Sequence, residues 1–246
     1  MKVAACIYGL PRGNKHVWSR LKNTLILPLS ADVYVHTWRA PSGGKTHHGS
    51  DDESYKPIAA LSSYWLGSNM INVRNFHVEK QFAGPVALIN APWGVVYASH
   101  QCNAWASILG SMADVDSKQY DWVCFTRFDC ILDCRLKLDA KLLTNADLLH
   151  FGRRGQDRYE AEDVLFFIRS EHLDVLRIIR ERVNKNFYTD SNIYNVIIHE
   201  FDARGLRVRA ADELGLRPPK IYRKGFKPFL RRLGRRVSEL LWRKVL

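Results

Sequence analysis

The sequence predicts an α/β domain with a mostly parallel central sheet flanked by helices, followed by a C-terminal basic amphipathic helix. Three observations predict it. Short runs rich in β-branched and aromatic residues, typical of buried strands, alternate with segments whose apolar residues have helical spacing. The chain has 246 residues, enough for one α/β domain with an appendage. No apolar run reaches the length of about 18 residues that a membrane-spanning helix needs.

The first elements are a strand, a helix and a second strand. Lys2–Tyr8 is a short apolar run with the composition of a buried strand. Trp18–Leu27 has apolar residues at positions 18, 21, 25 and 26, close to helical spacing, and Pro28 is expected to stop this helix. Ala31–Trp38 is the next strand. This succession predicts a parallel βαβ unit, whose ligand site lies at the carboxyl ends of the strands.

The residues at those carboxyl ends suit a phosphate group. Gly9 and Pro11 allow the backbone to turn tightly after the first strand, and Arg12 supplies a planar cation that matches phosphate oxygens. The loop matches neither a P-loop nor the G-x-G-x-x-G pattern. His36 lies at the end of the second strand, and two interpretations stay open for it: a ligand contact, or a packed and hydrogen-bonded side chain.

The middle of the chain leads into a second buried strand. Residues 41–52 are rich in Gly, Ser, His and Asp and are expected to form a loop. From Tyr55 to Val95 the signal is mixed, with a candidate strand at Ile71–Val78. Tyr97–Met112 has apolar or aromatic residues at positions 97, 98, 102, 105, 108, 109 and 112, which predicts an amphipathic helix.

The segment Tyr120–Asp133 begins as a buried strand and then places Arg127 and Asp129 two residues apart. In a strand, residues i and i+2 face the same way. Charged groups at the end of a buried strand are costly to desolvate unless they meet each other, a metal or a charged ligand. The pair is therefore either a structural ion pair or the centre of a phosphate site.

Two acids, Glu162 and Asp163, come directly before the apolar run Val164–Ile168. Adjacent carboxylates at the mouth of a strand suit general-base chemistry, because repulsion and partial burial raise the pKa of one of them. The alternative is a cap with solvated carboxylates. The other elements expected in this half of the chain are strands at Leu143–Phe151 and Gly205–Arg209 and helices at Glu171–Val183 and Asp190–Phe201.

The cysteines and the N-terminus predict a cytoplasmic protein. No two cysteines form a C-x-x-C pair, and their surroundings are largely apolar, which favours buried free thiols over a disulfide or metal site. The first ten residues are not followed by a small-residue cleavage site. The five cysteines are Cys6, Cys102, Cys124, Cys130 and Cys134.

The basic charge of the chain is concentrated in its tail. The formal net charge is +12, and Arg217–Leu246 contains eleven Lys or Arg against one acid. Residues 1–216 keep 26 basic and 24 acidic residues, a net charge of +2. The chain is therefore divided into a nearly neutral body, 1–216, and a basic tail, 217–246.

The tail is expected to be an amphipathic helix on an anionic membrane surface. Its apolar residues follow the i, i+3, i+4, i+7 spacing, and arginines fill the other positions. Each basic side chain near such a surface contributes about 1 kcal/mol. Packing of the apolar stripe on protein is one alternative, and nucleic-acid binding is another, disfavoured because the body has no second basic stripe. The residues assigned to the membrane contact are Phe229, Arg231, Arg232, Leu233, Arg235, Arg236, Leu240 and Trp242.

Four motifs in order resemble a family, the small glycosyltransferases of the GT-A type from bacteria and large algal viruses, which build surface polysaccharides. Ile7–Arg12 is similar to the G-x-P-R element of the family, and Ala31–Trp38 to its A-D-V-x-x-H-T-W element. Tyr120–Asp129 is similar to its Y-D-x-V...R-x-D element, and Glu162–Phe166 falls where a second acidic element is expected. The resemblance covers residues 2–210 and excludes the tail.

The resemblance implies a GT-A-like fold and a nucleotide-sugar donor whose hexosyl or deoxyhexosyl group is transferred to an acceptor hydroxyl. By position, Gly9, Pro11 and Arg12 are expected to contact the nucleotide and its diphosphate, with His36, Arg127 and Asp129 lining the same donor site. The resemblance also implies that Asp163, or else Glu162, is the general base of an inverting enzyme. The predicted acceptor is a cell-surface polysaccharide, lipopolysaccharide or lipid-linked glycan at the cytoplasmic membrane face.

The metal-binding motif that the resemblance implies lacks one of its acids. The resemblance places Asp129 at the last position of a D-x-D motif that binds Mn²⁺ or Mg²⁺, but Arg127 replaces the first acid. Arg127 either holds a phosphate or orients Asp129, and Asp133 is a candidate second ligand. Two rival functions stay open: another nucleotide-dependent transferase, such as a nucleotidyltransferase, and a non-catalytic membrane or nucleic-acid adaptor.

Overall fold

A computed structural model of the chain describes residues 1–10, 12–39, 58–79, 88–91, 94–132, 136, 145–151, 153–154, 159–160, 165–184, 193–211, 216 and 219–221. The helices are α1 (Lys15–Leu21), the π-helix η1 (Lys22–Ile26), α2 (Leu27–Leu29), α3 (Ile58–Leu66), α4 (Ala98–Met112), the 3₁₀ helices η2 (Ser117–Gln119) and η3 (Ser170–His172), α6 (Leu173–Asn184) and α7 (Ile193–Ala203).

The strands of the main sheet are β1 (Val3–Gly9), β2 (Asp32–Trp38), β3 (Asn72–Glu79), β6 (Trp122–Arg127), β8 (Leu148–His150), β11 (Leu165–Arg169) and β12 (Val208–Ala210). Three short pairs accompany it: β4 (Leu88–Ala91) with β5 (Gly94–Tyr97), β9 (Arg153–Arg154) with β10 (Tyr159–Glu160), and β7 (Cys130–Ile131) with β13 (Lys220–Ile221).

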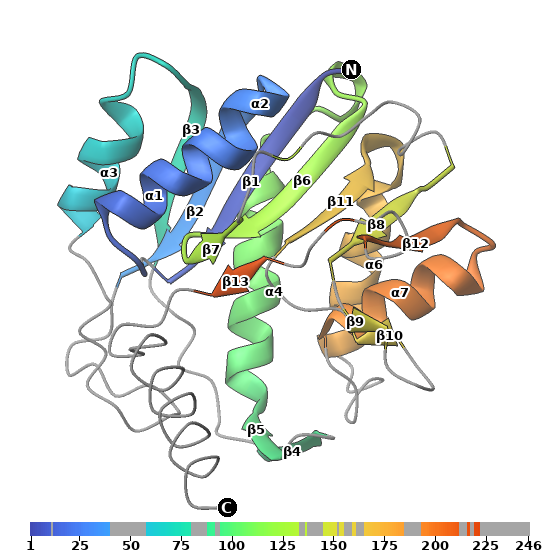
Figure 1. Cartoon of the computed structure of the whole chain (residues 1–246). Helices are drawn as coiled ribbons and strands as arrows, with labels where there is room; N and C mark the ends of the chain where they lie inside the picture. Colours follow the sequence, from blue (N-terminus) through green and yellow to red (C-terminus); the bar gives the residue numbers. More distant parts are fainter. Residues whose placement is uncertain are drawn as a thin grey trace, which may run out of the picture.

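The seven strands of the main sheet lie in the order β12-β8-β11-β6-β1-β2-β3 (Figure 1). Every neighbouring pair is parallel except the two that involve β11, which runs antiparallel to β6 and to β8. The predicted fold class, an α/β domain with a mostly parallel sheet flanked by helices, is confirmed.

The strand order reverses between β1 and β6. From β1 the chain adds β2 and then β3 on one side, whereas β6 pairs with the opposite edge of β1. In open α/β sheets, ligands bind outside the carboxyl ends of the strands at such a reversal. The residues that follow β1 and β6 therefore occupy the expected ligand position.

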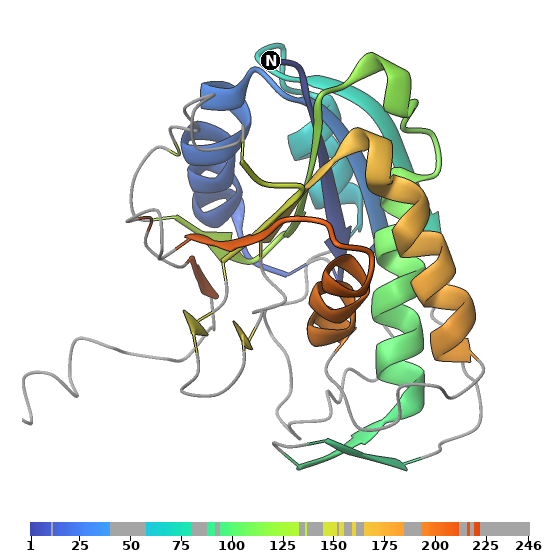
Figure 2. The ribbon, with the colours of Figure 1, turned by 90° about the vertical axis from the view of Figure 1, so that its right-hand side faces the viewer.

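Alternation along β1 divides the core between two faces of the sheet. Val3, Ala5 and Ile7 pack on one face with α1, η1 and α3, while Cys6 and Tyr8 pack on the other with α4, α6 and α7. Successive strand residues point to opposite faces, so a continuous apolar run identifies a strand that is buried on both. Figure 2 shows the resulting three layers, with the sheet between the two groups of helices.

Most of the elements expected in the body are confirmed within a few residues. Strands β1, β2, β3 and β6 form where strands are expected. So do helix α4, which ends at Met112, and the later helices and short strands. The mixed region also contains α3 and the β4–β5 hairpin, which the sequence did not predict.

The prediction that Pro28 stops the first helix is wrong. The helical backbone continues through η1 and α2 to Leu29 and ends at Ser30, which has a left-handed φ of 49°. Proline lacks the N–H that would bond the carbonyl four residues earlier. That carbonyl, on Thr24, accepts a 2.7 Å hydrogen bond from the Leu136 N–H instead, so the proline leaves no buried acceptor unsatisfied.

Several predictions fall outside the described residues. They are the loop at 41–52, Pro11, Glu162, Asp163, Asp133, the start of the helix expected at 190, and the membrane-contact residues of the tail. The boundary between residues 216 and 217 stays a prediction. Within the part of the chain that the structure describes, no helix is both long enough and apolar enough to cross a bilayer.

Candidate functional site

Gly9 ends β1 in a conformation that side chains rarely adopt. Its φ is +103°, a region that glycine enters without steric cost. The Gly9 N–H donates to Ser107 Oγ at 2.8 Å, and the Gly9 carbonyl accepts from Thr37 Oγ1 at 3.0 Å. The last peptide groups of β1 are thus held from α4 on one side and from β2 on the other.

Arg127 and Asp129 form a two-pronged ion pair at the end of β6. Arg127 Nε donates to Asp129 Oδ1 at 2.9 Å, and Arg127 Nη2 donates to Asp129 Oδ2 at 2.7 Å. The Asp129 side chain is 2% exposed and the Arg127 side chain 17%. Such bidentate pairs fix the plane of the guanidinium as well as its position.

Arg12 approaches the same carboxylate from the loop after β1. Arg12 Nη1 lies 4.0 Å from Asp129 Oδ2. The loop is fixed locally, because the Arg12 N–H donates to the Leu10 carbonyl at 2.7 Å and Trp18 Nε1 donates to the Arg12 carbonyl at 2.9 Å. Gly13 follows with a φ of +93°, and a Cβ there would lie 3.1 Å from Trp18 Nε1.

The two arginines and the aspartate bring two positive charges and one negative charge to the reversal point of the sheet. They come from separate segments whose strands are in register: Tyr8, before Gly9, pairs with Arg127. The arginine side chains are partly exposed, whereas the carboxylate is buried. A site of this composition attracts anions with planar sets of oxygens, such as phosphates.

The contacts of Asp129 do not favour a divalent cation. Both of its oxygens accept guanidinium hydrogen bonds, and a second guanidinium lies within 4.0 Å. A cation bound there would meet two positive groups. Mg²⁺ and Mn²⁺ need several oxygen ligands. The described residues contain no group of three or more side chains suited to hold a metal ion, and the other candidate acids, Asp133, Glu162 and Asp163, lie outside those residues.

His36 borders the site but is packed inside the protein. Its side chain is 1% exposed and its ring meets Trp38 edge-on at a centroid distance of 4.7 Å. His36 Nδ1 lies 3.0 Å from Ser107 Oγ, and Nε2 lies 3.4 Å from Glu79 Oε2. Burial lowers the pKa of His36, and the Glu79 carboxylate opposes this only in part. The His36 ring is therefore packed and hydrogen-bonded, and its contact with a donor stays a prediction.

The structure brings together four of the residues assigned to the donor site: Gly9, Arg12, Arg127 and Asp129. His36 joins them through Ser107 and not by direct contact with the arginines. Pro11, Glu162 and Asp163 lie outside the described residues. The strand after the two acids, β11, begins at this sheet edge, with Leu165 paired to Thr126.

Ser107 and Gly110 of α4 are site residues that the sequence did not reveal. Ser107 is fully buried, and a Cβ at Gly110 would lie 2.2 Å from His36 Cδ2. Serine and glycine on the buried face of an amphipathic helix are the available signal, since both disfavour helix interiors.

The cysteines that the structure describes in detail are structural. Cys6, Cys124 and Cys130 are free and fully buried. Burial raises the pKa of Cys130 to about 12 and raises the pKa of the Cys6 and Cys124 thiols as well. Reactive cysteines have lowered pKa values and partial exposure, so these three fit the predicted buried thiols.

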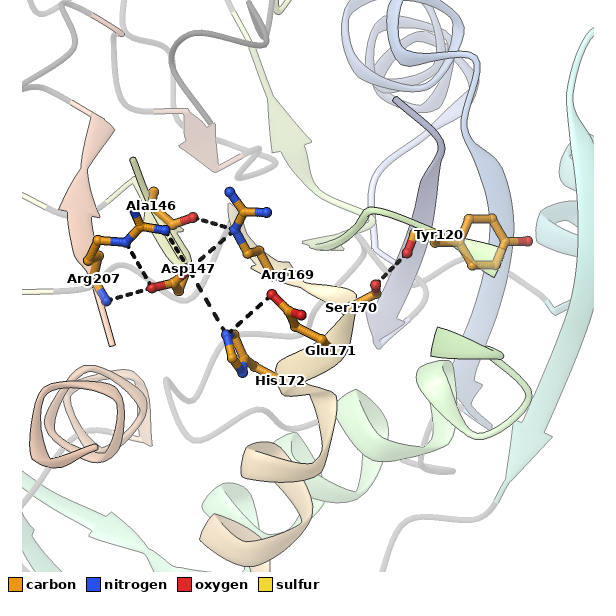
Figure 3. Close-up of polar contacts among 8 residues, drawn as sticks. All are labelled: Tyr120, Ala146, Asp147, Arg169, Ser170, Glu171, His172 and Arg207. Carbon is orange, nitrogen blue, oxygen red and sulfur yellow. Dashed lines mark hydrogen bonds and ion pairs between the residues drawn. The ribbon is translucent and has the colours of Figure 1, made fainter. Parts of the chain in front are cut away.

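A second ion network lies at the opposite edge of the sheet, around Asp147 (Figure 3). Arg207 bonds both carboxylate oxygens, through its backbone N–H at 2.9 Å and its guanidinium at 3.1 and 3.2 Å. Arg169 Nε lies 3.2 Å away and His172 Nε2 4.0 Å away. This network joins the starts of β8 and β12 to the end of β11. Arg169 pairs with Trp122, the first residue of β6, so the network lies at the opposite end of the strands from Gly9 and Arg127. It provides a structural ion pair with which the Arg127–Asp129 pair can be compared.

The chain was compared with protein-family models, curated proteins and solved structures. No protein-family model matches the chain, and a search of curated proteins finds no match. Among solved structures, the chain is similar to a glycosyltransferase involved in the glycosylation of the major capsid of PBCV-1, with a TM-score of 0.45, 10% identity, and 85% of this chain and 81% of that chain covered.

It is also similar to a nucleoside-diphosphate-sugar pyrophosphorylase from Vibrio cholerae RC9, with a TM-score of 0.46, 8% identity, and 85% of this chain and 90% of that chain covered. Similarity at this level carries no inference about activity. What the chain binds has to be argued from its own residues.

Proposed function

We propose that the chain is a glycosyltransferase that takes a hexose or deoxyhexose from a nucleotide-sugar donor. The observation that carries the proposal is the meeting of Arg12 and Arg127 at buried Asp129, beside the glycine turn that ends β1. The position at the reversal of strand order is the one where α/β sheets bind nucleotides and phosphates. The resemblance of four motifs to those of GT-A-type enzymes supports the same donor class.

The proposed chemistry uses the arginines as electrostatic groups. The bond between the anomeric carbon and the donor phosphate breaks, a bond from that carbon to the acceptor oxygen forms, and the nucleoside diphosphate leaves with the electron pair. Negative charge develops on the diphosphate, and fixed cations stabilise it in the transition state. Arg12 and Arg127 supply those cations, while Asp129 holds the Arg127 guanidinium in one plane.

The acceptor proton is assigned to Asp163, with Glu162 as the alternative, if the enzyme inverts configuration. The assignment rests on the family resemblance and on the place of β11. That strand follows the two acids and begins opposite Thr126, one residue before Arg127. A base has to come within about 2.6–3.2 Å of the attacking hydroxyl in the productive complex.

The predicted Mn²⁺ or Mg²⁺ stays a proposal of the resemblance. The guanidinium contacts of Asp129 favour a donor site in which cationic side chains replace the metal. Activity measured in excess EDTA, then with Mn²⁺ or Mg²⁺ restored, separates the two. Full activity in EDTA removes a dissociable metal from the mechanism, and loss that either ion reverses would support a ligand role for Asp129 despite its contacts.

The acceptor and the location are proposed from the tail. A basic amphipathic segment at 217–246 would hold the enzyme on the cytoplasmic face of the membrane, where a polysaccharide, lipopolysaccharide or lipid-linked acceptor is made. The support is the composition of this segment: eleven basic residues with apolar residues at helical spacing.

The activity is tested by donor hydrolysis. The purified chain is incubated with a panel of nucleotide sugars, and slow release of nucleoside diphosphate is expected from at least one of them. Arg127→Gln is expected to lower that rate by about 10- to 100-fold, because it removes hydrogen bonds from a charged group. Arg169→Gln is the matched control, since Arg169 is also a partly exposed arginine beside a buried aspartate but lies at the opposite sheet edge.

Two results would contradict the proposal. One is equal loss of activity in the two arginine variants while both stay folded. The other is formation of a nucleotide sugar from a nucleoside triphosphate and a sugar 1-phosphate, with pyrophosphate released, which would assign nucleotidyl transfer instead.

A further inference from the structure

Ser107 is a buried hydroxyl that joins the ends of two strands. It lies in α4, is 0% exposed, and contacts Gly9 of β1 and His36 of β2. A buried hydroxyl is costly unless it is hydrogen-bonded. The next serine on the helix, Ser111, satisfies its hydroxyl on the carbonyl of Ile108 in the same helix. Ser107 uses its hydroxyl across the layer boundary instead, at the edge where the donor site lies.

The direction of the Ser107–His36 hydrogen bond depends on the tautomer of the ring, and one direction follows on from the Gly9 bond. The Gly9 N–H donates to Ser107 Oγ at 2.8 Å. The serine proton is then available for His36 Nδ1, 3.0 Å away, which places the imidazole proton on Nε2, facing Glu79 at 3.4 Å. Burial lowers the pKa of His36, which favours the neutral ring.

Gly110 makes the arrangement possible. It lies three residues after Ser107, on the same helix face, and a Cβ there would lie 2.2 Å from His36 Cδ2 and 2.7 Å from His36 Nε2. Any side chain at position 110 would displace the ring from Ser107. Ser107 and Gly110 together form a seat for His36 on α4.

Ser107 contacts the candidate donor site through its hydrogen bond with the Gly9 peptide. Gly9 has a φ of +103° and directs the chain into the turn that carries Arg12. Thr37 holds the Gly9 carbonyl at 3.0 Å, so the Ser107 bond is the second of two clamps on the same residue. Without it, the Gly9 turn keeps the Thr37 contact and the loop keeps its local hydrogen bonds, but the link to α4 is lost.

We propose that Ser107 and Gly110 are positioning residues of the donor site, which set the Gly9 turn, and with it Arg12, through the hydrogen bond to Gly9 and the seated His36 ring. This proposal rests on the proposed function, because it assigns the Gly9–Arg12 loop to donor phosphate. It adds a link from α4 to that loop, which lies outside the motifs that suggest the function.

The first test needs no ligand. Imidazole ¹⁵N shifts of the full chain at pH 7, with His36 assigned from its loss in His36→Gln, report the tautomer. The Nε2–H form is expected in the wild type and in Ser111→Ala, and a mixed tautomer in Ser107→Ala. An Nδ1–H tautomer or a protonated ring in the wild type would overturn the hydrogen-bond chain, and this result is independent of any activity.

The second test measures the link to the loop with inorganic pyrophosphate as the probe. Calorimetric titration is expected to give Ser107→Ala a Kd weaker by about 3- to 10-fold, the factor for one neutral hydrogen bond. Ser107→Thr, which keeps the hydroxyl, and Ser111→Ala, which removes a buried hydroxyl bonded within the helix, are expected to stay within about twofold.

The outcomes are distinguishable. Equal affinity in Ser107→Ala and Ser111→Ala would overturn the positioning role while leaving the proposed function intact. Failure of the wild type to bind either pyrophosphate or nucleoside diphosphates would overturn the proposed function, and the positioning role with it, whereas the ¹⁵N shifts would still decide the hydrogen-bond chain. If Ser107→Ala does not fold, Gly110→Ala, which displaces the His36 ring, takes its place in the titration. Weaker pyrophosphate binding is expected, and a Kd within about twofold of the wild type would overturn the positioning role.

Discussion

Gly110→Ala is a substitution whose effect should have the opposite sign to the one helix propensity predicts. Gly110 lies inside α4, where Ala is preferred over Gly by about 0.8–1 kcal/mol. An ordinary Gly→Ala exchange in such a helix therefore stabilises it. At this position, however, the new methyl group would lie 2.2 Å from His36 Cδ2, far inside the ordinary carbon contact distance of about 3.5–4.0 Å.

The size of the effect follows from three terms. Overpacking of a buried site costs about 1–3 kcal/mol. Displacement of the His36 ring also loses the hydrogen bond between Ser107 Oγ and His36 Nδ1, worth about 1 kcal/mol. The propensity gain offsets about 1 kcal/mol of this. We expect the free energy of unfolding of Gly110→Ala to fall by about 1–3 kcal/mol.

A double-mutant cycle with His36→Ala separates these terms. Removing the ring gives the methyl group space, so in that background Gly110→Ala should raise the free energy of unfolding by about 0.5–1 kcal/mol. Urea unfolding of the four proteins, followed by tryptophan fluorescence and circular dichroism, gives the coupling energy. Stabilisation by Gly110→Ala in the wild-type background, equal to that in His36→Ala, would refute the seating of His36 on α4.

Two further predictions concern the opposite sheet edge and the tail. Burial alone would raise the pKa of Asp147, but the hydrogen bonds and charge of Arg207, with His172, outweigh it and lower the pKa below 3.8. The network should therefore stabilise the fold above about pH 4, and this part is lost as the pH falls through the lowered pKa. Asp147→Asn should weaken the pH dependence of the free energy of unfolding in that acid range only. An unchanged pH dependence there, measured by urea unfolding at several pH values, would contradict the assignment. Full-length protein should sediment with anionic vesicles and lose that binding in about 0.5 M salt, which screens surface charge. A chain ending at residue 216 should stay in solution. Equal sedimentation of both proteins would refute the membrane role of the tail.

The strands could be predicted because burial on both faces leaves a continuous apolar signature. Val3–Gly9 and Trp122–Arg127 are such strands. The first ends at a glycine and the second at a charged residue, which mark the ends of the apolar runs. The antiparallel direction of β11 and the route of the helix through Pro28 could not be predicted. The first depends on strand pairing between distant segments, and the second on a hydrogen bond from Leu136, more than a hundred residues away in sequence.

The donor site shows the same division. Arg127 and Asp129 could be predicted as neighbours because residues i and i+2 of a strand share a face, although β6 ends at Arg127 and Asp129 lies in the turn that follows it. That Arg12 joins them follows from the parallel register of β1 and β6, for which the sequence offered only an indication. Ser107 was missed because its role comes from the docking of α4 across two strand ends, and the local sequence reads as an ordinary amphipathic helix.

The central claim is that Arg12 and Arg127 bind the diphosphate of the donor. Isothermal titration of the full chain with nucleoside diphosphates, in the presence and absence of Mn²⁺, tests it most directly. Arg12→Gln should weaken the tightest of these ligands by about 10- to 100-fold, whereas Arg207→Gln, which removes the same charge at the opposite sheet edge, should change its Kd by less than about twofold. Equal affinities in the two variants, or no binding by the wild type, would contradict the claim.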